Sequence, residues 1–128
     1  MMAIGIGCRK GTAPEVILAV ITEALQKQGI GISRPLVIAT GGIKADEEGI
    51  REAAQRLLAT FVVTTDEAMR AVAIRTLTHS DVSFSYTGLP SLSEAAALAA
   101  AGPTARLIGP RHVSQGVACA IAILENRA

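Results

Sequence analysis

The sequence is poor in aromatic residues, and its charges nearly cancel. Among 128 residues it has no tryptophan, and Phe61, Phe84 and Tyr86 are its only aromatic side chains. Few rings are therefore present on which unpaired bases could stack, and a formal net charge of +1 indicates no broad basic surface for nucleic acid. These shortages exclude a nucleic-acid binder and predict a core built from aliphatic side chains.

Cysteines are also scarce, and no hydrophobic run is long. Cys8 and Cys119 are too few for a disulfide framework, and their spacing fits no zinc motif. The longest apolar stretches, such as residues 116–124, fall short of the roughly 20 residues that span a bilayer, and no signal-peptide pattern opens the sequence. We therefore expect reduced thiols, a cytoplasmic location, no metal site and no membrane partner.

Hydrophobic residues, by contrast, make up 50% of the sequence. Strand-length apolar runs alternate with longer amphipathic segments, which predicts a single three-layer α/β/α domain over residues 1–128 with a mostly parallel or mixed sheet. The predicted strands cover residues 3–8, 36–40, 61–64, 105–109 and 117–124, and the predicted helices cover 14–28, 50–58, 66–77 and 93–101. Residues 79–91 read as turn-rich. The last helix is mostly alanine, so its backbone can approach the sheet or a ligand closely.

Three predicted helix starts carry the capping-box pattern S/T-x-x-E. The pairs are Thr12 with Glu15, Thr64 with Glu67, and Ser91 with Glu94. In this motif the hydroxyl and the carboxylate each accept a hydrogen bond from an otherwise unpaired backbone N–H group. For Thr12, Glu15, Ser91 and Glu94, a capping role and a functional role remain equally open.

The stretch IGIGCRKGTAPE joins the first predicted strand to the first helix. A dinucleotide fingerprint needs G-x-G-x-x-G, whereas Gly5, Gly7 and Gly11 leave one residue too many before the last glycine. A P-loop is excluded because Lys10 precedes the last glycine and no GK[ST] follows. A strand end with Arg9 and Lys10 before a helix N-terminus still suits a carboxylate or a phosphate. The alternative is that both cations are solvated loop charges.

Cys8 lies beside these cations and a helix start. Both features lower the pKa of a thiol, so Cys8 could act as a nucleophile. At a strand end, however, cysteine commonly packs as a small hydrophobic side chain. We take packing as the main interpretation of Cys8, and core packing as that of Cys119.

A short charged cluster, KADEE, follows the second predicted strand, at the end where open α/β sheets place their sites. Asp46 could equally be a helix N-cap, and Glu47 and Glu48 could be partners of the helix dipole. Lys44 has no such capping role. Lys44, Asp46 and Glu47 are candidate catalytic residues, because an amine and a carboxylate could polarise a carbonyl group and transfer protons.

A third polar cluster, GPRHVSQG, follows another predicted strand and holds Arg111 and His112. The spacing of His112 and His79 fits no metal motif, and His79 is predicted to lie on the surface. A Ser-His-Asp triad of Ser91, His112 and Asp46 lacks the G-x-S-x-G elbow that would support it.

Taken together, these loops resemble a known family. The segments GIGCRKGT, KADEEGI, GLPSLSEAAAL and GPRHVSQGVACAIA are similar, in this order, to successive motifs of the CobE and CbiG C-terminal domain family of cobalamin biosynthesis. The resemblance extends over nearly the whole chain, so it is more specific than any single motif. It implies a compact three-layer α/β/α domain that works in the corrin pathway.

The resemblance implies two alternative activities. CbiG proteins carry the domain behind additional N-terminal sequence and open a lactone in a cobalt-containing precorrin, releasing acetaldehyde. CobE proteins consist of the domain alone and are associated with binding a corrin intermediate. The length of the chain favours the CobE alternative, a carrier or accessory protein without a cofactor. The other alternative is a stand-alone cobalt-precorrin-5A hydrolase of the CbiG type.

The family's motif positions transfer to this sequence residue by residue. They are Gly5, Gly7, Cys8, Arg9 and Gly11 in the first loop, Lys44, Asp46 and Glu47 in the second, and Ser93, Glu94 and Ala95 in the third. The last motif departs from the family, in which lysine is often found near the position of Arg111 or His112, so the role of His112 stays open.

The implied ligand fits the residues already described. Corrin intermediates bear many acetate and propionate carboxylates, which arginine and lysine side chains bind well, and an aliphatic cleft can hold the face of the ring. The expected ligand-binding residues are Gly7, Cys8, Arg9, Lys10, Gly11, Thr12, Lys44, Ser91, Ser93, Glu94, Arg111 and His112. The expected partner is a corrin or precorrin intermediate, and other enzymes of the cobalamin pathway remain open as further partners.

Overall fold

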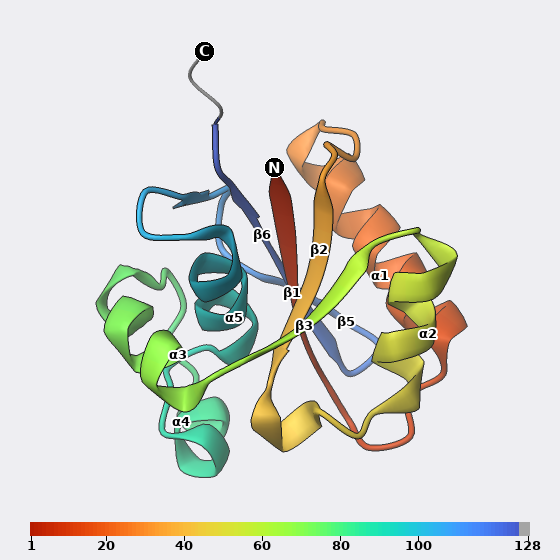
Figure 1. Ribbon diagram of the computed structural model, residues 1–128. Coiled ribbons are helices and arrows are strands. Elements are labelled where there is room, and N and C mark those ends of the chain that lie inside the picture. Colours follow the sequence, from red (N-terminus) through yellow and green to blue (C-terminus); the bar gives the residue numbers. More distant parts are fainter. Residues whose placement is uncertain (126–128) are drawn as a thin grey trace.

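A mixed sheet runs through the centre of the molecule (Figure 1). The computed structural model describes residues 1–125, so the last three residues of the expected 1–128 domain lie outside the described residues. The strands within this range are β1 (Met2–Cys8), β2 (Leu36–Gly41), β3 (Thr60–Thr64), β4 (Arg106–Leu107), β5 (His112–Ser114) and β6 (Val117–Ile123). They are ordered β3-β2-β1-β6-β4, and β5 also pairs with β6.

The first three strands pair in parallel, and every pair that includes β6 is antiparallel. β1 pairs in parallel with β2, and β2 with β3. β6 runs antiparallel to β1 along its whole length, from Met2 opposite Ile123 to Cys8 opposite Val117. β4 and β5 are in turn antiparallel to β6. The prediction of a mixed sheet is therefore confirmed.

Helices cover both faces of the sheet (Figure 1). The helices are α1 (Pro14–Gln28), α2 (Glu48–Arg56), α3 (Asp66–Val72), α4 (Asp81–Thr87) and α5 (Leu92–Ala101), and short 3-10 turns follow β2 at η1 (Gly42–Lys44) and α3 at η2 (Ala73–Arg75). One face carries α1 and α2, and the other carries α3 and α5, with α4 beside the start of α5. The predicted three layers are thus present.

The two faces of the sheet have different cores. Under α1 and α2 the core consists of larger aliphatic side chains, such as those of Ile4, Ile17 and Ile38. Under α5 it consists mainly of alanines from the helix and from the strands, such as Ala97 and Ala122. Small side chains bring the axis of a helix close to a sheet, because the backbones are not held apart by bulk. The core predicted from the shortage of aromatic residues is aliphatic, as expected.

Gly5 is the point of closest approach between α5 and the sheet. A Cβ atom at this position would lie 1.8 Å from the backbone oxygen of Ser93 and 2.8 Å from the backbone nitrogen of Ala97. These distances are far shorter than a van der Waals contact, so only glycine fits here. The alanine-rich helix therefore packs its backbone directly on β1. Of the two close approaches that its composition allows, to the sheet or to a ligand, this is the one to the sheet.

Buried hydroxyls join the carboxyl ends of the parallel strands. Thr40 Oγ1 of β2 donates a hydrogen bond to the carbonyl oxygen of Ile6 in β1, at 2.8 Å. Thr64 Oγ1 of β3 donates to the carbonyl oxygen of Thr40, at 3.1 Å. Both threonines are buried, so these bonds hold three adjacent strand ends in a fixed relation.

The capping boxes predicted at the starts of α1 and α3 are wrong. The N-cap of α1 is Ala13, without a side-chain cap, and Thr12 Oγ1 instead donates to the carbonyl oxygen of Arg9 at 2.6 Å. The N-cap of α3 is Thr65 rather than Thr64, and its hydroxyl accepts from the N–H group of Ala68. The motif places the cap one residue away from where the chain enters each helix.

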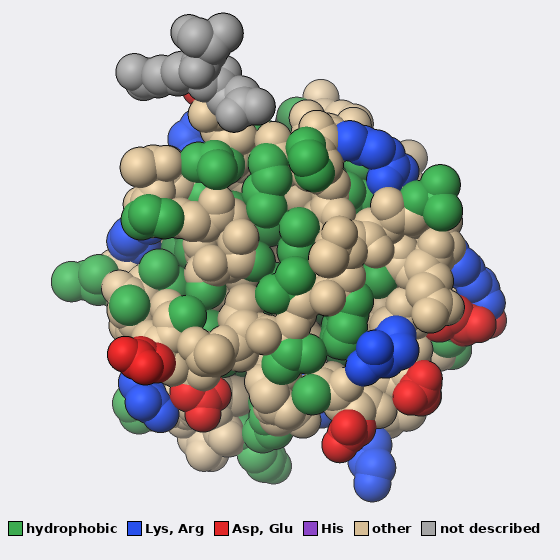
Figure 2. Space-filling view, in the orientation of Figure 1, with side chains coloured by type: hydrophobic (Ala, Val, Ile, Leu, Met, Phe, Trp, Pro, Cys, Tyr) green, Lys and Arg blue, Asp and Glu red, His purple; other side chains and the backbone are tan. Residues whose placement is uncertain are grey.

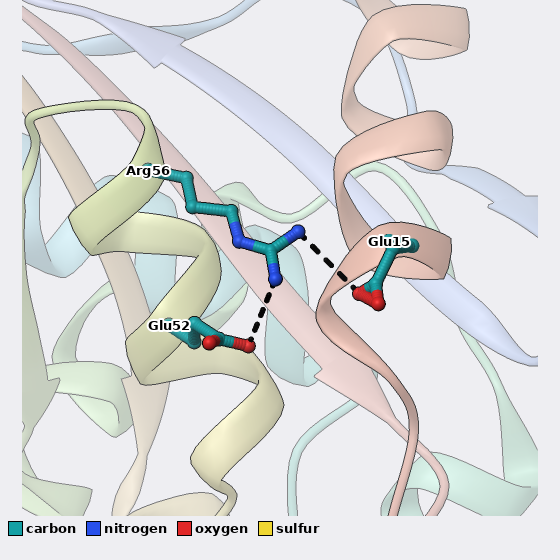
Figure 3. A network of polar contacts seen from close by, with 3 residues as sticks. All are labelled: Glu15, Glu52 and Arg56. Carbon is teal, nitrogen blue, oxygen red and sulfur yellow. Dashed lines mark hydrogen bonds and ion pairs between the residues drawn. The ribbon is translucent and has the colours of Figure 1, made fainter.

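Glu15 serves a different purpose from the one its pattern predicts. Its Oε2 atom lies 3.5 Å from Nη1 of Arg56 in α2, and Nη2 of Arg56 lies 3.3 Å from Oε2 of Glu52 (Figure 3). The three side chains are about half exposed or more, so the network adds little stability and mainly aligns α1 with α2.

Other boundaries differ from the predicted ones for local reasons. The helix predicted over 50–58 ends at Arg56, because Leu58 adopts a left-handed conformation with φ 55° and is exposed. The helix predicted over 66–77 ends as α3 at Val72 and continues only as η2. The helix α4 and the short strand β5 were not predicted, and the strand predicted over 105–109 is reduced to β4.

Gly5→Ala tests the contact between α5 and β1. The added methyl group must displace the backbone of the helix, so we expect the free energy of unfolding to fall by about 2 kcal/mol or more in urea denaturation. Gly7→Ala is the matched control, because its Cβ atom would meet only Leu92 Cδ2 at 3.8 Å, an ordinary contact. Equal stability of the two variants would contradict the proposed packing.

Candidate functional site

A cleft opens at the carboxyl ends of β1 and β2 and has a volume of about 620 Å³. Its walls come from the loop after β1, from η1, from α4 with the segment before it, and from the β5–β6 hairpin. The inner wall is formed by small or apolar residues of β1, β6 and the start of α5, namely Gly7, Ala118, Leu92 and Ser93. The carboxyl ends of parallel strands are the edge where open α/β sheets bind their ligands.

Four cationic side chains line this cleft. They are Arg9 and Lys10 from the loop after β1, Lys44 from η1, and Arg111 from the segment before β5. Within residues 1–125, none of the four side chains forms an ion pair or a hydrogen bond. Their positive charge is therefore not neutralised inside the protein and is available to an anionic ligand.

The outer part of the cleft is apolar. Ile43, Val82, Tyr86 and Val113 all line it, and they are exposed by 57%, 68%, 75% and 55% respectively. Figure 2 shows exposed hydrophobic side chains at the lower edge of the molecule, where Figure 1 places α4. Apolar surface that is not covered by the protein itself favours contact with an apolar part of a ligand. The cleft thus combines apolar area with unpaired positive charge.

Two loops of the cleft are fastened to each other by residues that do not line it. Glu47 Oε2 accepts a hydrogen bond from the N–H group of Gly11 at 3.0 Å. A Cβ atom at Gly49 would lie 2.1 Å from the carbonyl oxygen of Thr12, so the start of α2 packs directly on the first loop. Gly11, Thr12 and Glu47 therefore shape the loops that present Arg9, Lys10 and Lys44.

Glu94 is fully buried and holds two other walls of the cleft together. Its Oε1 atom accepts from the N–H groups of Leu77 and Thr78, at 2.8 and 2.9 Å. Its Oε2 atom accepts from the hydroxyl of Thr78 and from the N–H group of Arg111, both at 2.8 Å. One carboxylate thus fixes the segment between α3 and α4 and the backbone of a cleft cation.

This arrangement shows that the third predicted capping box is also wrong. Ser91 is the N-cap of α5, but its side chain makes no capping bond, and its buried Oγ atom has no partner among the described residues. Glu94 turns away from the helix start toward donors that lie 16 and 17 residues away in the chain. Neither Ser91 nor Glu94 lines the cleft.

His112 and Asp46 also lie outside the cleft. His112 Nε2 is 2.9 Å from Glu23 Oε1 of α1, on the opposite side of the sheet from α5. The hydrogen bond from His112 is the main cause that lowers the pKa of Glu23, and a bond from Ser114 adds to it. This contact fastens β5 to α1. Asp46 is exposed in the turn before α2, whose N-cap is Glu47.

Cys8 lines the cleft, but its environment disfavours the thiolate. Burial is the main cause that raises the pKa of Cys8, and the nearby carboxylate of Glu47 adds to it, while Thr12 and Lys44 act in the opposite direction. Cys119 lies in the core, where burial raises its pKa to about 12. These shifts favour the interpretation of both cysteines as packed thiols.

Several cleft residues were not expected from the sequence. Half of them come from the segment of α4, which supplies Ser80, Val82, Ser83, Tyr86 and Thr87, and the others are Ile43, Leu92, Val113, Gly116 and Ala118. Two of the three aromatic side chains, Phe84 and Tyr86, lie on α4 and are exposed, and their grouping in one short segment is the signal that could have found it.

The chemistry that the cleft supports is binding of an anion. Among the described residues that line it, none is Asp, Glu or His. In residues 1–125, no group of three or more His, Cys, Asp and Glu side chains is placed to hold a metal ion. Within the same range, no helix is both long and apolar enough to cross a membrane.

The fold and the cleft define an α/β domain with a cationic, partly apolar cleft at the carboxyl edge of its parallel strands. The profile of the family described as "Cobalamin synthesis G C-terminus" matches residues 2–122. The chain is also 31% identical to Protein CobE of Sinorhizobium sp, over 94% of this chain and 79% of the relative. The chain therefore belongs to this family and is a cobalamin biosynthesis protein of the CobE and CbiG type.

Two further comparisons place the chain within the family. A crystal structure of CobE, a protein from the cobalamin (vitamin B12) biosynthetic pathway, superposes with a TM-score of 0.90 at 30% identity, covering 99% of this chain and 93% of that one. Cobalt-precorrin-5A hydrolase of Priestia megaterium is 32% identical over 80% of this chain. The match covers only 27% of that enzyme.

Glu94→Gln tests the role of the buried carboxylate. Glutamine has one acceptor oxygen in place of two, so the donors bound to one of the two Glu94 oxygens lose their partner, and we expect the free energy of unfolding to fall by about 2 kcal/mol or more. Glu47→Gln is the control, since a single bond from Gly11 can be kept by the remaining oxygen. Urea denaturation measures both, and an unchanged stability of Glu94→Gln would contradict the assignment.

The raised pKa of Cys8 predicts slow alkylation. Because the thiolate is the reacting form, the rate with iodoacetamide should rise with pH and reach its midpoint above the ordinary value of 9.0. Mass spectrometry identifies the labelled residue, and the variant Cys8→Ser should remain unlabelled because Cys119 is buried. A midpoint near neutral pH would instead show an activated nucleophile.

Proposed function

We propose that this protein binds a carboxylate-rich corrin or precorrin intermediate and acts in cobalamin biosynthesis as a cytoplasmic carrier or accessory protein. The observation that carries the proposal is the presence, in one cleft, of four cations that have no ion pair or hydrogen bond within residues 1–125, beside exposed apolar side chains. Such an intermediate has complementary chemistry, because acetate and propionate groups surround a ring with an apolar face.

The geometry suits recognition at the edge of the ring. Arg9 and Lys10 project from one loop, Lys44 from a second and Arg111 from a third, so that the charges are spread around the cleft. Carboxylates distributed around a ring can meet several of them at once, whereas a single small anion can meet few. Val82 and Tyr86 lie one helical turn apart on α4 and supply apolar surface for the ring.

Binding is favoured over hydrolysis by the position of the acids. The candidate catalytic carboxylates of Asp46 and Glu47 do not line the cleft, and Glu47 is engaged with Gly11. A general acid or base must reach the substrate, and only Lys44 of the three candidates lines the cleft. The match covers 27% of the relative named as a hydrolase, and the reaction of that relative is the alternative for this chain. Transfer of the ligand to other pathway enzymes completes the proposed role.

Cobyrinic acid, a corrin with free carboxylates, provides the test. Calorimetric melting should show a higher Tm in its presence at low salt, because a ligand bound only by the folded state stabilises it, and the shift should shrink at high salt. Arg9→Ala combined with Lys44→Ala should reduce the shift strongly. Lys27→Ala, which removes an exposed cation of α1 outside the cleft, is the matched control and should leave it unchanged.

Two results would overturn the proposal. One is the absence of both a Tm shift and a binding heat with cobyrinic acid. The other is a release of acetaldehyde from a cobalt-precorrin lactone by this protein alone, which would replace the carrier role with the hydrolase.

A further inference from the structure

The first turn of α5 presents backbone donors beside the inner wall of the cleft. The N–H group of Leu92 donates to Ser83 Oγ of α4 at 3.3 Å. Within residues 1–125, the N–H groups of Ser93 and Glu94 have no acceptor. Unpaired donors are normal at a helix start, and with the helix dipole they favour a negative charge there. By themselves they do not define a site.

A second, independent feature lies at the same place. Ser93 lines the cleft and is only 1% exposed, and its Oγ atom has no hydrogen-bond partner among the described residues. Buried hydroxyls without a partner are uncommon, because the lost bond to water is not replaced. A ligand atom that reaches the inner wall of the cleft would supply the missing partner.

Packing alone does not account for the hydroxyl of Ser93. The close approach of α5 to the sheet requires small side chains, and the next residues meet this requirement as Ala95, Ala96 and Ala97, all fully buried. Alanine in place of Ser93 would fill the same space without an unpaired polar atom. The contacts within the described residues therefore give the Ser93 hydroxyl no structural role.

We infer that the Ser93 hydroxyl, at the N-terminal turn of α5, donates a hydrogen bond to one carboxylate of the ligand and forms a carboxylate subsite on the inner wall of the cleft. The inference rests on the proposed function and names a contact within it. Arg111 completes the subsite, because Glu94 holds its backbone next to the first turn of α5 and its side chain lines the cleft. Glu94 is the nearest acid on the helix, and its two oxygens already accept four hydrogen bonds.

The two buried serines of α5 provide a matched pair of variants. Like Ser93 Oγ, Ser91 Oγ is buried and has no hydrogen-bond partner in the described part of the chain, but Ser91 does not line the cleft. Isothermal titration should show that Ser93→Ala binds cobyrinic acid about tenfold more weakly than the unaltered protein, the order expected for a hydrogen bond to a charged group, and that Ser91→Ala binds it equally well. Both variants should melt at or above the temperature of the unaltered protein, because each loses an unpaired buried hydroxyl.

The combination of outcomes separates this inference from the proposed function. If the unaltered protein binds cobyrinic acid and Ser93→Ala binds it as tightly, the subsite is wrong while the proposed function stands. If the unaltered protein does not bind cobyrinic acid, the proposed function fails, and acetate decides the subsite. Titration with acetate, followed by amide NMR, should then shift the Ser93 and Glu94 resonances in the unaltered protein and not in Ser93→Ala. The absence of that difference would overturn the inference.

Discussion

The contact between α5 and β1 is the constraint on which the rest of this structure depends. Gly5 removes the one side chain that would hold the two backbones apart, and the alanines of α5 do the same along the rest of the interface. The helix is thereby fixed against a central strand, and its first turn comes to lie at the carboxyl edge of the sheet. Glu94 is carried on that turn, and its hydrogen bonds fix the position of two other cleft walls.

Around the cleft, acidic and basic residues have separate places. Glu23, Glu47 and Glu94 each hold a loop or a strand through a hydrogen bond, and none of them lines the cleft. The cations Arg9, Lys10, Lys44 and Arg111 line the cleft and are left without an internal partner in residues 1–125. The formal net charge of the sequence is only +1, but the cleft carries a local excess of positive charge. Such an excess acts at short range, where salt does not screen it fully.

Elements with a strong periodic pattern were predictable from the sequence, and contacts between distant residues were not. The bounds of α1 were predicted correctly, because its apolar spacing, Pro14 and Gly29 all agree. α4 has few apolar residues in helical register, and three-residue β5 is too short to show a pattern, so both were missed. The fold class and the family followed from features spread over the whole chain.

The candidate site was predictable in part for the same reason. The cations of the loops could be chosen because each follows a predicted strand, and parallel strands end at one edge of a sheet. The role of Glu94 could not be predicted, since its local pattern is that of a capping box and its true partners lie far along the chain. His112 was named because it lies in the polar cluster GPRHVSQG after a predicted strand, and it contacts α1 instead. Contacts that depend on tertiary structure are invisible in local spacing.

The antiparallel pairing of β1 with β6 determines the order in which this chain can fold during synthesis. Of the described strands, β1 is the first to leave the ribosome, and β6, its partner along all seven residues, is the last. Until β6 emerges, one edge of β1 stays unpaired beside an apolar surface, a state in which chains are prone to aggregate. The parallel unit of β1, α1 and β2 can form earlier, but β1 gains its second neighbour in the sheet only after β6 has emerged. The central sheet of the described residues is therefore complete only when its first strand has paired with its last.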